Sequence, residues 1–391
     1  MTTKFNVDIS DKNHIAVSGR IDSSNAQAFE SCLSAYISQK FDTLTIDAEK
    51  LSYISSAGLR VLIKLRRNAE NTITIENTTD DVYQIFDMTG FSQLFKVKKG
   101  FRRLSVEGCP VIGTGFYGTV YRIDPDTIVK VYQPSCGIPQ IEEEQKKAKA
   151  AFLKGIPTAI SYDIVKVGDS YGLVFEMLKS ESFNDLIIQY PEQIDENIKR
   201  WSDLLKKVHS TTMDPGVLPS AKAIHLNYLE VVRDYLDDAQ YNYLHAFLEK
   251  IPNRMTVVHG DYQMKNVMLS EDEPMLIDME TLAVGHPIFD MAGIYVTYQM
   301  FEEDEPGNTI AFYGIPASTC DYIWDKLLEY YLETNDAAII QSETKKIKLI
   351  AAVRFLYILA ISDLKEGPLG ELRIRHTKEH IGELMNQMEN L

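Results

Sequence analysis

The sequence predicts a protein in two parts, an α/β domain over residues 1–100 and an α+β part with a β-rich lobe at 101–178 and a helical lobe at 179–391. Three observations support this division. Strand and helix patterns alternate through the first hundred residues, as in α/β domains. A glycine-rich stretch between two strands opens the second part. A polar loop between two apolar strands lies further along, in the part that we expect to be mainly helical.

Composition excludes several classes of protein. Hydrophobic residues make up 45% of the chain and charged residues 25%, which is ordinary for a soluble protein. The net charge of -16 argues against a nucleic-acid partner, because phosphate backbones are bound by basic surfaces. There is no leader pattern and no apolar run of membrane-spanning length, so we expect a cytoplasmic protein without a membrane partner. The four scattered cysteines predict reduced thiols.

The first hundred residues follow a strand and helix alternation. Apolar residues at every second position indicate strands, and apolar residues three or four apart indicate helices. The expected strands lie at 5–9, 15–17, 44–47 and 72–76, and the expected helices at 22–37, 55–65 and 80–88.

Three stretches of this segment point to one family. They are GRIDS at 19–23, LTIDAEKLSYISSAGLRVL at 44–62 and MTGFSQLF at 88–95. Together they resemble the STAS domain of anti-sigma factor antagonists. The resemblance implies a STAS-like fold, a protein partner, and phosphorylation of a serine at the start of the second helix. Ser56 and Ser55 are the candidates, although the residue directly before the glycine is alanine here.

Two interpretations of these serines stay open. A phosphoserine would add a charge of about -1.5 to -2 at the positive end of a helix and would repel an acidic partner. Alternatively, Ser55 or Ser56 caps the helix, as serine commonly does.

A glycine-rich loop opens the second part. The stretch VIGTGFYGTVYRI at 111–123 places Gly113, Gly115 and Gly118 between two strands, where their backbone amides can close over phosphates. Because this loop joins two strands and no acidic residue follows at the dinucleotide spacing, a kinase-type loop is favoured over a Rossmann loop.

A lysine follows on the next strand. Lys130 shares a strand face with residues 128 and 132, so it can reach phosphates beneath the loop. The helix at 141–154 carries three acids near its start, and we expect Glu144 to pair with Lys130. These acids also favour the positive helix start, which is the alternative. The strand ending at Glu176 and Met177 would offer backbone groups to an adenine base.

The polar loop carries the predicted chemistry. In TVVHGDYQMKN at 256–266, Asp261 and Asn266 lie five residues apart, and Asp278 follows after a turn centred on Asp272. A hairpin centred there would place Asn266 opposite Asp278, and the two oxygens would suit a magnesium ion. Asp261 would remain free as a base.

From residue 111 onward the chain resembles the aminoglycoside phosphotransferase and choline kinase family, whose fold is protein kinase-like. The resemblance rests on His259-Gly-Asp261, IDME at 277–280, and GHPIFDMA at 285–292. It implies ATP and Mg²⁺ as cofactors, with Asp261 as base and Asn266 and Asp278 as magnesium ligands. Lys130 would clamp phosphate with Glu144 as its partner. His259 and Asp290 would support the catalytic loop.

Three functions remain open on this sequence. The first is a small-molecule kinase that phosphorylates a hydroxyl group, with the STAS domain docking a protein partner. The second is a signalling kinase that phosphorylates protein serine, including Ser56 or Ser55 of its own chain, since tethering raises effective concentration. The third is a module in which nucleotide binding gates partner exchange. Acidic runs at 227–238 and 301–306 suit an amine acceptor or form a solvated surface.

Overall fold

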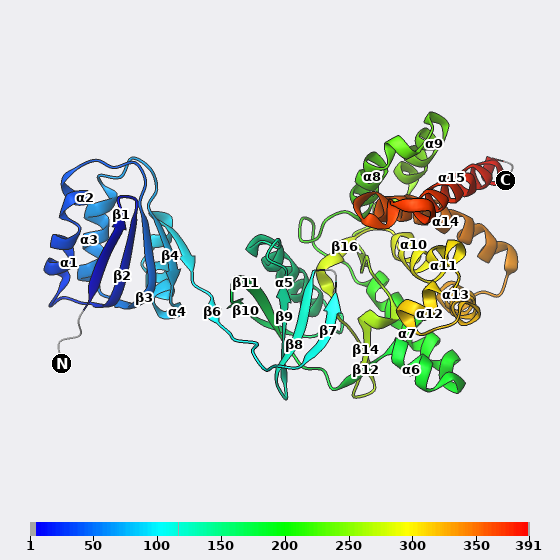
Figure 1. The fold of residues 1–391 in the computed structure, drawn as a ribbon, viewed down its shortest axis with the longest axis horizontal. Helices are drawn as coiled ribbons and strands as arrows, with labels where there is room; N and C mark the ends of the chain where they lie inside the picture. The colour runs from blue at the N-terminus through cyan, green and yellow to red at the C-terminus, as the bar shows by residue number, and fades with distance from the viewer. Residues whose placement is uncertain (1–4, 116, 390–391) are drawn as a thin grey trace. The chain divides into compact units, whose positions relative to one another are not determined.

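A computed structural model describes residues 5–115 and 117–389. The chain divides into two compact units, Met1–Ser105 and Val106–Leu391 (Figure 1). Each unit has its own architecture and is described by itself.

The first unit is a five-stranded sheet flanked by helices. The strands are β1 (Asn6–Asp11), β2 (His14–Ile21), β3 (Thr45–Ile54), β4 (Thr74–Thr78) and β5 (Lys96–Lys99). The helices are α1 (Ala26–Cys32), α2 (Ser34–Ser38), α3 (Ser56–Arg66) and α4 (Asp80–Met88), followed by a 3-10 turn, η1 (Phe91–Gln93). The strand order is β1-β2-β3-β4-β5; β1 is antiparallel to β2, and the other neighbours are parallel. The predicted α/β class is confirmed.

The core of this unit follows the predicted periodicities. Ile15 and Val17 of β2 are buried two residues apart, and Leu62 and Leu65 of α3 are buried at helical spacing. Gly58 lets α3 approach the sheet, because a Cβ there would lie 2.7 Å from the side chain of Ile54.

Two expectations for this unit were wrong. The helix expected over 22–37 is divided into α1 and α2, because the backbone of Leu33 leaves helical geometry at ψ +8°. The strand β5 was missed, since Val97 is the single apolar residue among three lysines.

The second unit begins with a small lobe that is mostly sheet. The two-residue strand β6 (Arg102–Arg103) precedes this unit in the chain. The strands of the small lobe are β7 (Val111–Gly115), β8 (Gly118–Asp124), β9 (Thr127–Tyr132), β10 (Ser161–Val167) and β11 (Ser170–Glu176). They pair in the order β10-β11-β9-β8-β7, and every pairing is antiparallel. The helix α5 (Ile138–Leu153) packs on β10 and β11.

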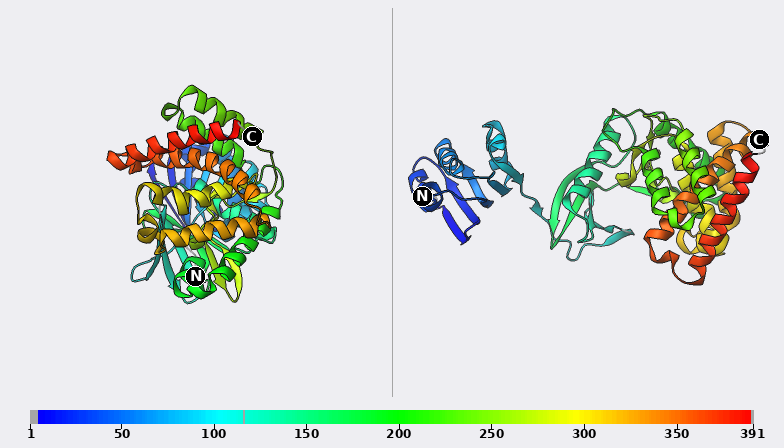
Figure 2. Two further views of the ribbon diagram at one scale, coloured as in Figure 1. Left: turned by 90° about the vertical axis from the view of Figure 1, so that its right-hand side faces the viewer. Right: turned by 90° about the horizontal axis from the view of Figure 1, so that it is seen from above.

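The large lobe is mainly helical. Its helices are α6 (Phe183–Gln189), α7 (Ile194–Ser210), α8 (Ala221–Val231), α9 (Asp238–Lys250), α10 (Ile288–Tyr295), α11 (Phe301–Asp304), α12 (Asn308–Tyr313), α13 (Ala317–Leu332), α14 (Ala337–Ile361) and α15 (Gly367–Glu389). A π-helical turn, η6 (Val296–Met300), links α10 to α11, and further 3-10 turns are η2 (Pro191–Gln193), η3 (Arg233–Tyr235) and η7 (Asp363–Lys365). Within this unit, Figure 2 shows the helices gathered away from the strands of the small lobe.

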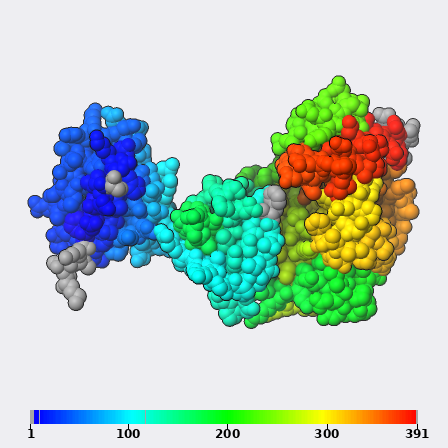
Figure 3. Space-filling view, in the orientation of Figure 1, coloured from blue at the N-terminus to red at the C-terminus, as the bar shows by residue number. Residues whose placement is uncertain are grey.

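Short strands of the large lobe carry the polar loop. They are β12 (Ser180–Ser182), β13 (Val257–Val258), β14 (Val267–Ser270), β15 (Glu273–Leu276) and β16 (Ala283–Val284). Apolar residues of these strands, such as Val258 and Val267, belong to the same buried core as Trp201 and Phe355. In Figure 3 the surface of α14 and α15 lies against that of α8 and α9, in agreement with the packing of these helices. Among the described residues, the helices lack a segment of the length and apolarity needed to cross a bilayer.

Candidate functional site

The polar loop joins β13 to a tight hairpin. A 3-10 turn, η4 (Met264–Asn266), leads into β14, and the β14–β15 turn consists of Glu271 and Asp272, both with positive φ (48° and 69°). The sequence pattern indicated Asp272 as the midpoint of the hairpin. Because the turn has two residues, the midpoint lies instead between Glu271 and Asp272. Asn266 therefore faces Ile277, whose amide donates to the Asn266 carbonyl at 3.0 Å, and Asp278 lies one residue further along. The expected opposition of Asn266 and Asp278 was wrong by one position.

Two side-chain amides orient the carboxylate of Asp261. Gln263 Nε2 and Asn266 Nδ2 each donate to Asp261 Oδ2 at 2.9 Å. Asn266 Nδ2 also donates to the Asp261 carbonyl at 3.0 Å. Among the described residues, Oδ1 receives no such hydrogen bond, so it is available to a further donor.

A buried aspartate braces this loop from behind. Asp290 of α10 accepts from the backbone amides of His259 and Gly260 at 2.8 and 2.6 Å, and His209 Nε2 lies 2.9 Å from it. Burial acts to raise the pKa of Asp290, but the His209 hydrogen bond and charge and the Gly260 amide outweigh burial, so the pKa lies below its usual value. A charged carboxylate is therefore stable here despite complete burial.

The His259 ring contacts the backbone on both sides, at Asp261 and at Ile277. Its Nδ1 accepts from the Asp261 amide at 3.3 Å, and its Nε2 lies 3.3 Å from the Ile277 carbonyl. These contacts assign the ring proton to Nε2 and tie the loop to the strand before Asp278. Gly260 has φ +84°, and a Cβ there would lie 2.5 Å from the Thr281 carbonyl, so glycine is required.

A lysine of the small lobe lies within ion-pair distance of three carboxylates. Lys130 Nζ lies 3.0 Å from Glu144 Oε1, 3.0 Å from Asp278 Oδ1 and 3.8 Å from Glu280 Oε2. Tyr132 donates to Glu144 Oε2 at 2.8 Å. The structure thus pairs Lys130 with Glu144, as expected, and also with Asp278 of the large lobe, a contact that the sequence did not predict. Burial acts to lower the pKa of Lys130, but the charges of Asp278 and Glu144 outweigh it and raise the pKa overall.

Glu280 is a residue that sequence reasoning missed. It lies in η5 (Met279–Thr281), two residues after Asp278. Burial raises the pKa of Glu280 to about 7, and the negative charge of Glu144 acts in the same direction, while Lys130 opposes both. The sequence shows that Glu280 belongs to the IDME motif. Its proximity to Lys130 could not be predicted, because that distance depends on the packing of the small lobe against the large lobe.

Oxygen donors of the kind that magnesium prefers lie in this region, although among the described residues no three acidic, histidine or cysteine side chains are gathered closely enough to hold a metal ion by themselves. Asp278 and Glu280 supply carboxylate oxygens, and Asn266 keeps its Oδ1 available because its Nδ2 is committed to Asp261. Together with Glu144 these carboxylates outnumber the single charge of Lys130. A hard divalent cation with retained waters suits such an oxygen set.

The glycine-rich loop is a hairpin of β7 and β8 in which Gly115 faces Gly118. Gly118 is required for packing, because a Cβ there would lie 2.2 Å from the Val131 carbonyl. Gly113 has its nearest neighbour, the Val120 side chain, at 3.8 Å, and Gly115 is also uncrowded. Among the described residues, Gly113 and Gly115 thus have room beside their Cα atoms, in contrast to Gly118.

The structure limits which backbone groups of Glu176 and Met177 could contact an adenine base. The Glu176 amide donates to the Ile160 carbonyl at 3.1 Å, and the Met177 amide donates to the Asp126 carbonyl at 2.8 Å. Neither amide is free, since both bond to backbone carbonyls at the end of the interior strand β11. Any donor to a bound base would come from another backbone group.

The two candidate serines differ in their surroundings. Ser55 is the N-cap of α3, and its hydroxyl accepts from the Gly58 amide at 3.5 Å. Ser56 is the first helical residue and is exposed. The capping interpretation therefore applies to Ser55, while Ser56 is open to modification.

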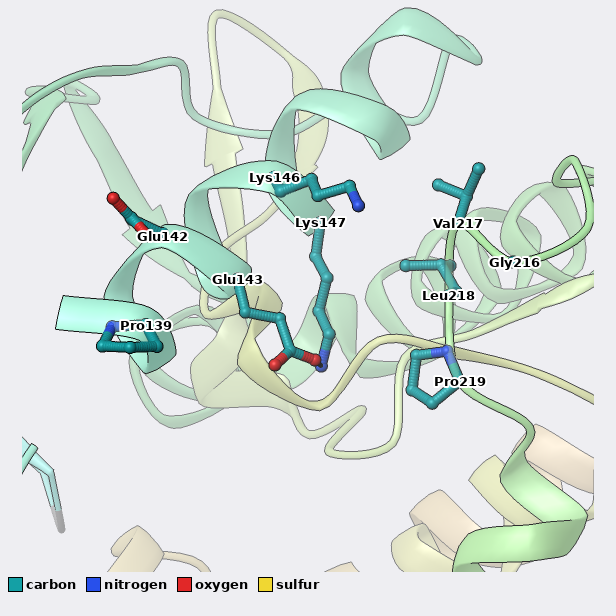
Figure 4. A pocket seen from close by; sticks show the side chains of 9 residues that line it. All are labelled: Pro139, Glu142, Glu143, Lys146, Lys147, Gly216, Val217, Leu218 and Pro219. Carbon is teal, nitrogen blue, oxygen red and sulfur yellow. Dashed lines mark ion pairs between the residues drawn. The ribbon is translucent and has the colours of Figure 1, made fainter. Parts of the chain in front are cut away.

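A second lysine connects α5 to the acidic turn. Lys147 Nζ donates to the Glu280 carbonyl at 2.7 Å and pairs with Glu143 at 3.3 Å (Figure 4). It borders a cavity of about 450 Å³ lined by Pro139, Glu142, Glu143, Lys146, Lys147, Gly216, Val217, Leu218 and Pro219. The sequence offered no way to find this contact, because it joins residues 133 positions apart.

Comparisons of the sequence identify both parts. The family described as "Phosphotransferase enzyme family" matches residues 109–328, and the STAS domain matches residues 5–103. BtrV of Bordetella bronchiseptica, described as an anti-sigma factor antagonist, is 32% identical over 82 residues, 20% of this chain and 71% of that protein. The anti-sigma-B factor antagonist of Listeria monocytogenes is 29% identical over 93 residues, 22% of this chain and 82% of that protein.

Solved structures similar to the chain include kinases of small molecules. An ethanolamine kinase of Plasmodium vivax is 14% identical, with a TM-score of 0.47, and the match covers 68% of this chain and 81% of that chain. The aminoglycoside phosphotransferase APH(2'')-Ib with bound ADP is 15% identical, with a TM-score of 0.45. This match covers 69% of the chain described here and 90% of the phosphotransferase chain. Such low similarity assigns no residue roles.

The family matches confirm both resemblances seen in the sequence, and with them the expected order of a STAS-like domain followed by a kinase-like fold. The phosphotransferase match covers more than half of the chain, 220 of 391 residues (328 - 109 + 1). This chain belongs to the phosphotransferase enzyme family and carries a STAS domain ahead of its phosphotransferase domain.

Proposed function

We propose that this protein transfers the γ-phosphate of ATP to a hydroxyl group of a small molecule, with Mg²⁺ as cofactor and the STAS domain as a docking or regulatory module. The observation that carries the proposal is the orientation of Asp261. Two amides hold its Oδ2, and Oδ1 remains to accept a hydroxyl proton. This is the arrangement that a base or hydroxyl-orienting residue requires.

The phosphate end of the site is supplied by both lobes. Gly113 and Gly115 leave space for phosphate oxygens, and Lys130 offers a positive charge beneath them. Glu144 and Tyr132 hold the lysine in place from the buried side. Preorganised charges of this kind account for most of the catalysis in phosphoryl transfer.

The proposed transfer of the phosphoryl group involves one proton transfer, one new bond and one broken bond. The acceptor hydroxyl gives its proton to Asp261, its oxygen forms a bond to the γ-phosphorus, and the bond from phosphorus to the ADP oxygen breaks. Asn266, Asp278 and Glu280 would hold magnesium, which when bound neutralises charge on the phosphate oxygens. Asp290 and His259 keep the loop of Asp261 rigid throughout.

A direct test is ADP release by the full-length protein with ATP, Mg²⁺ and a panel of amino sugars, amino alcohols, hydroxy acids and sugars. Stimulation by one class, with phosphate recovered on that compound, supports the proposal. ATP binding without turnover on any compound would instead favour a nucleotide-gated module that exchanges protein partners.

A second function is favoured by Ser56. Because this residue is exposed at the start of α3 while Ser55 serves as the cap, Ser56 is a suitable acceptor for a signalling kinase, including this one. Peptide mass spectrometry after incubation with ATP and Mg²⁺ tests it. Phosphate on Ser56 that depends on Asp261 would support self-modification, and an unmodified Ser56 would count against it.

A further inference from the structure

Helices α8, α10 and α14 bring together side chains that the transfer step does not use. Tyr228 of α8 stacks on Tyr357 of α14, with ring centroids 3.8 Å apart. The His225 ring lies 4.4 Å from that of Phe289 and 5.1 Å from that of Tyr228. We call these four residues and Arg354 of α14 the α8–α14 cluster.

Arg354 is half-buried, and its guanidinium makes no hydrogen bond or ion pair with any residue that the structure describes. A partly buried cation without a partner costs free energy. The chain has 56 acidic and 40 basic residues, so an acidic partner would be readily available to it. An unpaired guanidinium in such a chain is explained if its partner is an anion that comes from outside.

The guanidinium lies near the catalytic loop. A Cβ on Gly293 of α10 would lie 3.3 Å from Arg354 Cζ and Nη1, so Arg354 rests on the helix where a side chain is missing. Gly293 is three residues after Asp290, and such positions are neighbours on a helix surface. Arg354 is thus about one helical turn from the carboxylate that braces the loop of Asp261.

The cluster is also connected to the loop of Asp261 through backbone pairing. Ser220, directly before α8, bridges to Val284 of β16, and β16 pairs with β13, the strand that leads into this loop. Helix α10 follows β16 in the chain. Both α8 and α10 therefore begin next to the strands that carry the loop.

His225 adds a buried polar atom to the α8–α14 cluster. Its Nδ1 donates to the Ala221 carbonyl at 2.9 Å, and its Nε2 has no partner among the described residues. Burial lowers the pKa of His225 to about 3, and the charge of Arg354 acts in the same direction. The ring is therefore neutral at pH 7, and its free nitrogen is an acceptor next to the cation.

We propose that the α8–α14 cluster binds a carboxylate of the acceptor through Arg354, with the stacked tyrosines packed against the carbon skeleton. This rests on the proposed function and specifies its substrate class: hydroxy acids or hydroxy amino acids. A guanidinium presents two parallel donors that match the two oxygens of a carboxylate. An amine at this position would be repelled by Arg354.

Matched pairs of acceptors test this proposal. Homoserine is compared with 3-aminopropan-1-ol, and glycerate with glycerol. Turnover of each compound is measured as ADP release. Binding of each compound is measured by calorimetric titration in the presence of a non-hydrolysable ATP analogue and Mg²⁺. The full-length protein is used in three variants: Arg354→Ala, Arg354→Lys, and Lys345→Ala as control. Lys345 lies nine residues earlier on α14, about two and a half turns away, so it points to the opposite side.

The proposal predicts that the carboxylate member of a pair binds and is turned over in preference. Arg354→Ala should raise its KM and Kd roughly ten- to a hundredfold, the loss expected for a charged hydrogen-bonded pair, with kcat largely kept. Arg354→Lys should recover part of the affinity, and Lys345→Ala should match the wild type.

Two results would overturn the site. One is equal or better use of the partners that lack a carboxylate, and the other is unchanged carboxylate binding in Arg354→Ala. If carboxylates bind through Arg354 but ADP is never released, the site is supported and the transfer function is contradicted. If the protein turns over ATP and no carboxylate probe binds, the transfer function survives and the site is refuted.

Discussion

At the scale of single residues, the site depends on how one carboxylate is held. Gln263 and Asn266 share Asp261 Oδ2, so the free oxygen is defined by two amides. Sequence motifs indicated Asp261 and Asn266, but Gln263 lacks a comparable pattern. Its role follows from the turn at η4, which folds residue 263 back over residue 261.

Gln263→Ala should therefore lower kcat about tenfold, because a carboxylate with one donor spends less time in the reactive orientation. The KM for ATP should change little, since Gln263 does not contact the phosphate end. Steady-state kinetics checks both constants. Gln193→Ala, an exposed glutamine, is the control, and an equal effect of both substitutions would refute this role.

Glu280 should make metal use depend on pH. Its pKa of about 7 means that the carboxyl is neutral at pH 6 and charged at pH 8. The apparent Mg²⁺ requirement should therefore fall as pH rises through 7, and Glu280→Gln should remove this dependence. Activity titrations against Mg²⁺ at several pH values provide the measurement.

The same shift has a consequence for stability. Folding raises the pKa of Glu280, so the protonated form favours the folded state; its stabilisation is full below about pH 4.5 and is lost as pH rises through 7. Without Mg²⁺, Glu280→Gln should melt at a higher temperature than the wild type at pH 8, and the difference should shrink at pH 5. A constant difference across this range would contradict the assignment.

At the scale of elements, most helices and strands followed from apolar periodicity, and the errors have physical causes. The β14–β15 register depends on turn chemistry: Glu271 and Asp272 adopt positive φ without glycine, which sequence patterns rarely indicate. The amides of Glu176 and Met177 are used by neighbouring backbone, which is set by sheet order. The pairing of Lys130 with Glu144 was accessible because it needs only a strand face and a helix start.

The glycine-rich hairpin yields a paired prediction. Gly118→Ala should destabilise the protein by roughly 1–3 kcal/mol or more, because its Cβ meets the Val131 carbonyl at 2.2 Å and backbone cannot move aside cheaply. Gly113→Ala should stay within about 0.5 kcal/mol of the wild type. Thermal denaturation without nucleotide measures both, and similar effects of the two substitutions would show that the hairpin packs differently.

At the scale of the whole molecule, the two units have separate hydrophobic cores. The core around Phe29 and Phe86 contains only residues of the first unit, and the core around Trp201 only residues of the second. The residues of the proposed chemistry all lie in the second unit.

Fragments 1–105 and 106–391 should therefore each fold alone, with cooperative thermal transitions by circular dichroism. Fragment 106–391 should retain acceptor-dependent ATP turnover. If either fragment is unfolded, or if fragment 106–391 is inactive although folded, the units depend on each other.

The most direct test of the central claim is acceptor-dependent ADP release by wild type and by Asp261→Asn at saturating ATP and Mg²⁺. The account predicts a loss of about a thousandfold or more in kcat, with folding and nucleotide affinity retained. A loss below tenfold in a folded Asp261→Asn protein would show that the hydroxyl group is activated elsewhere, and the proposed mechanism would be wrong.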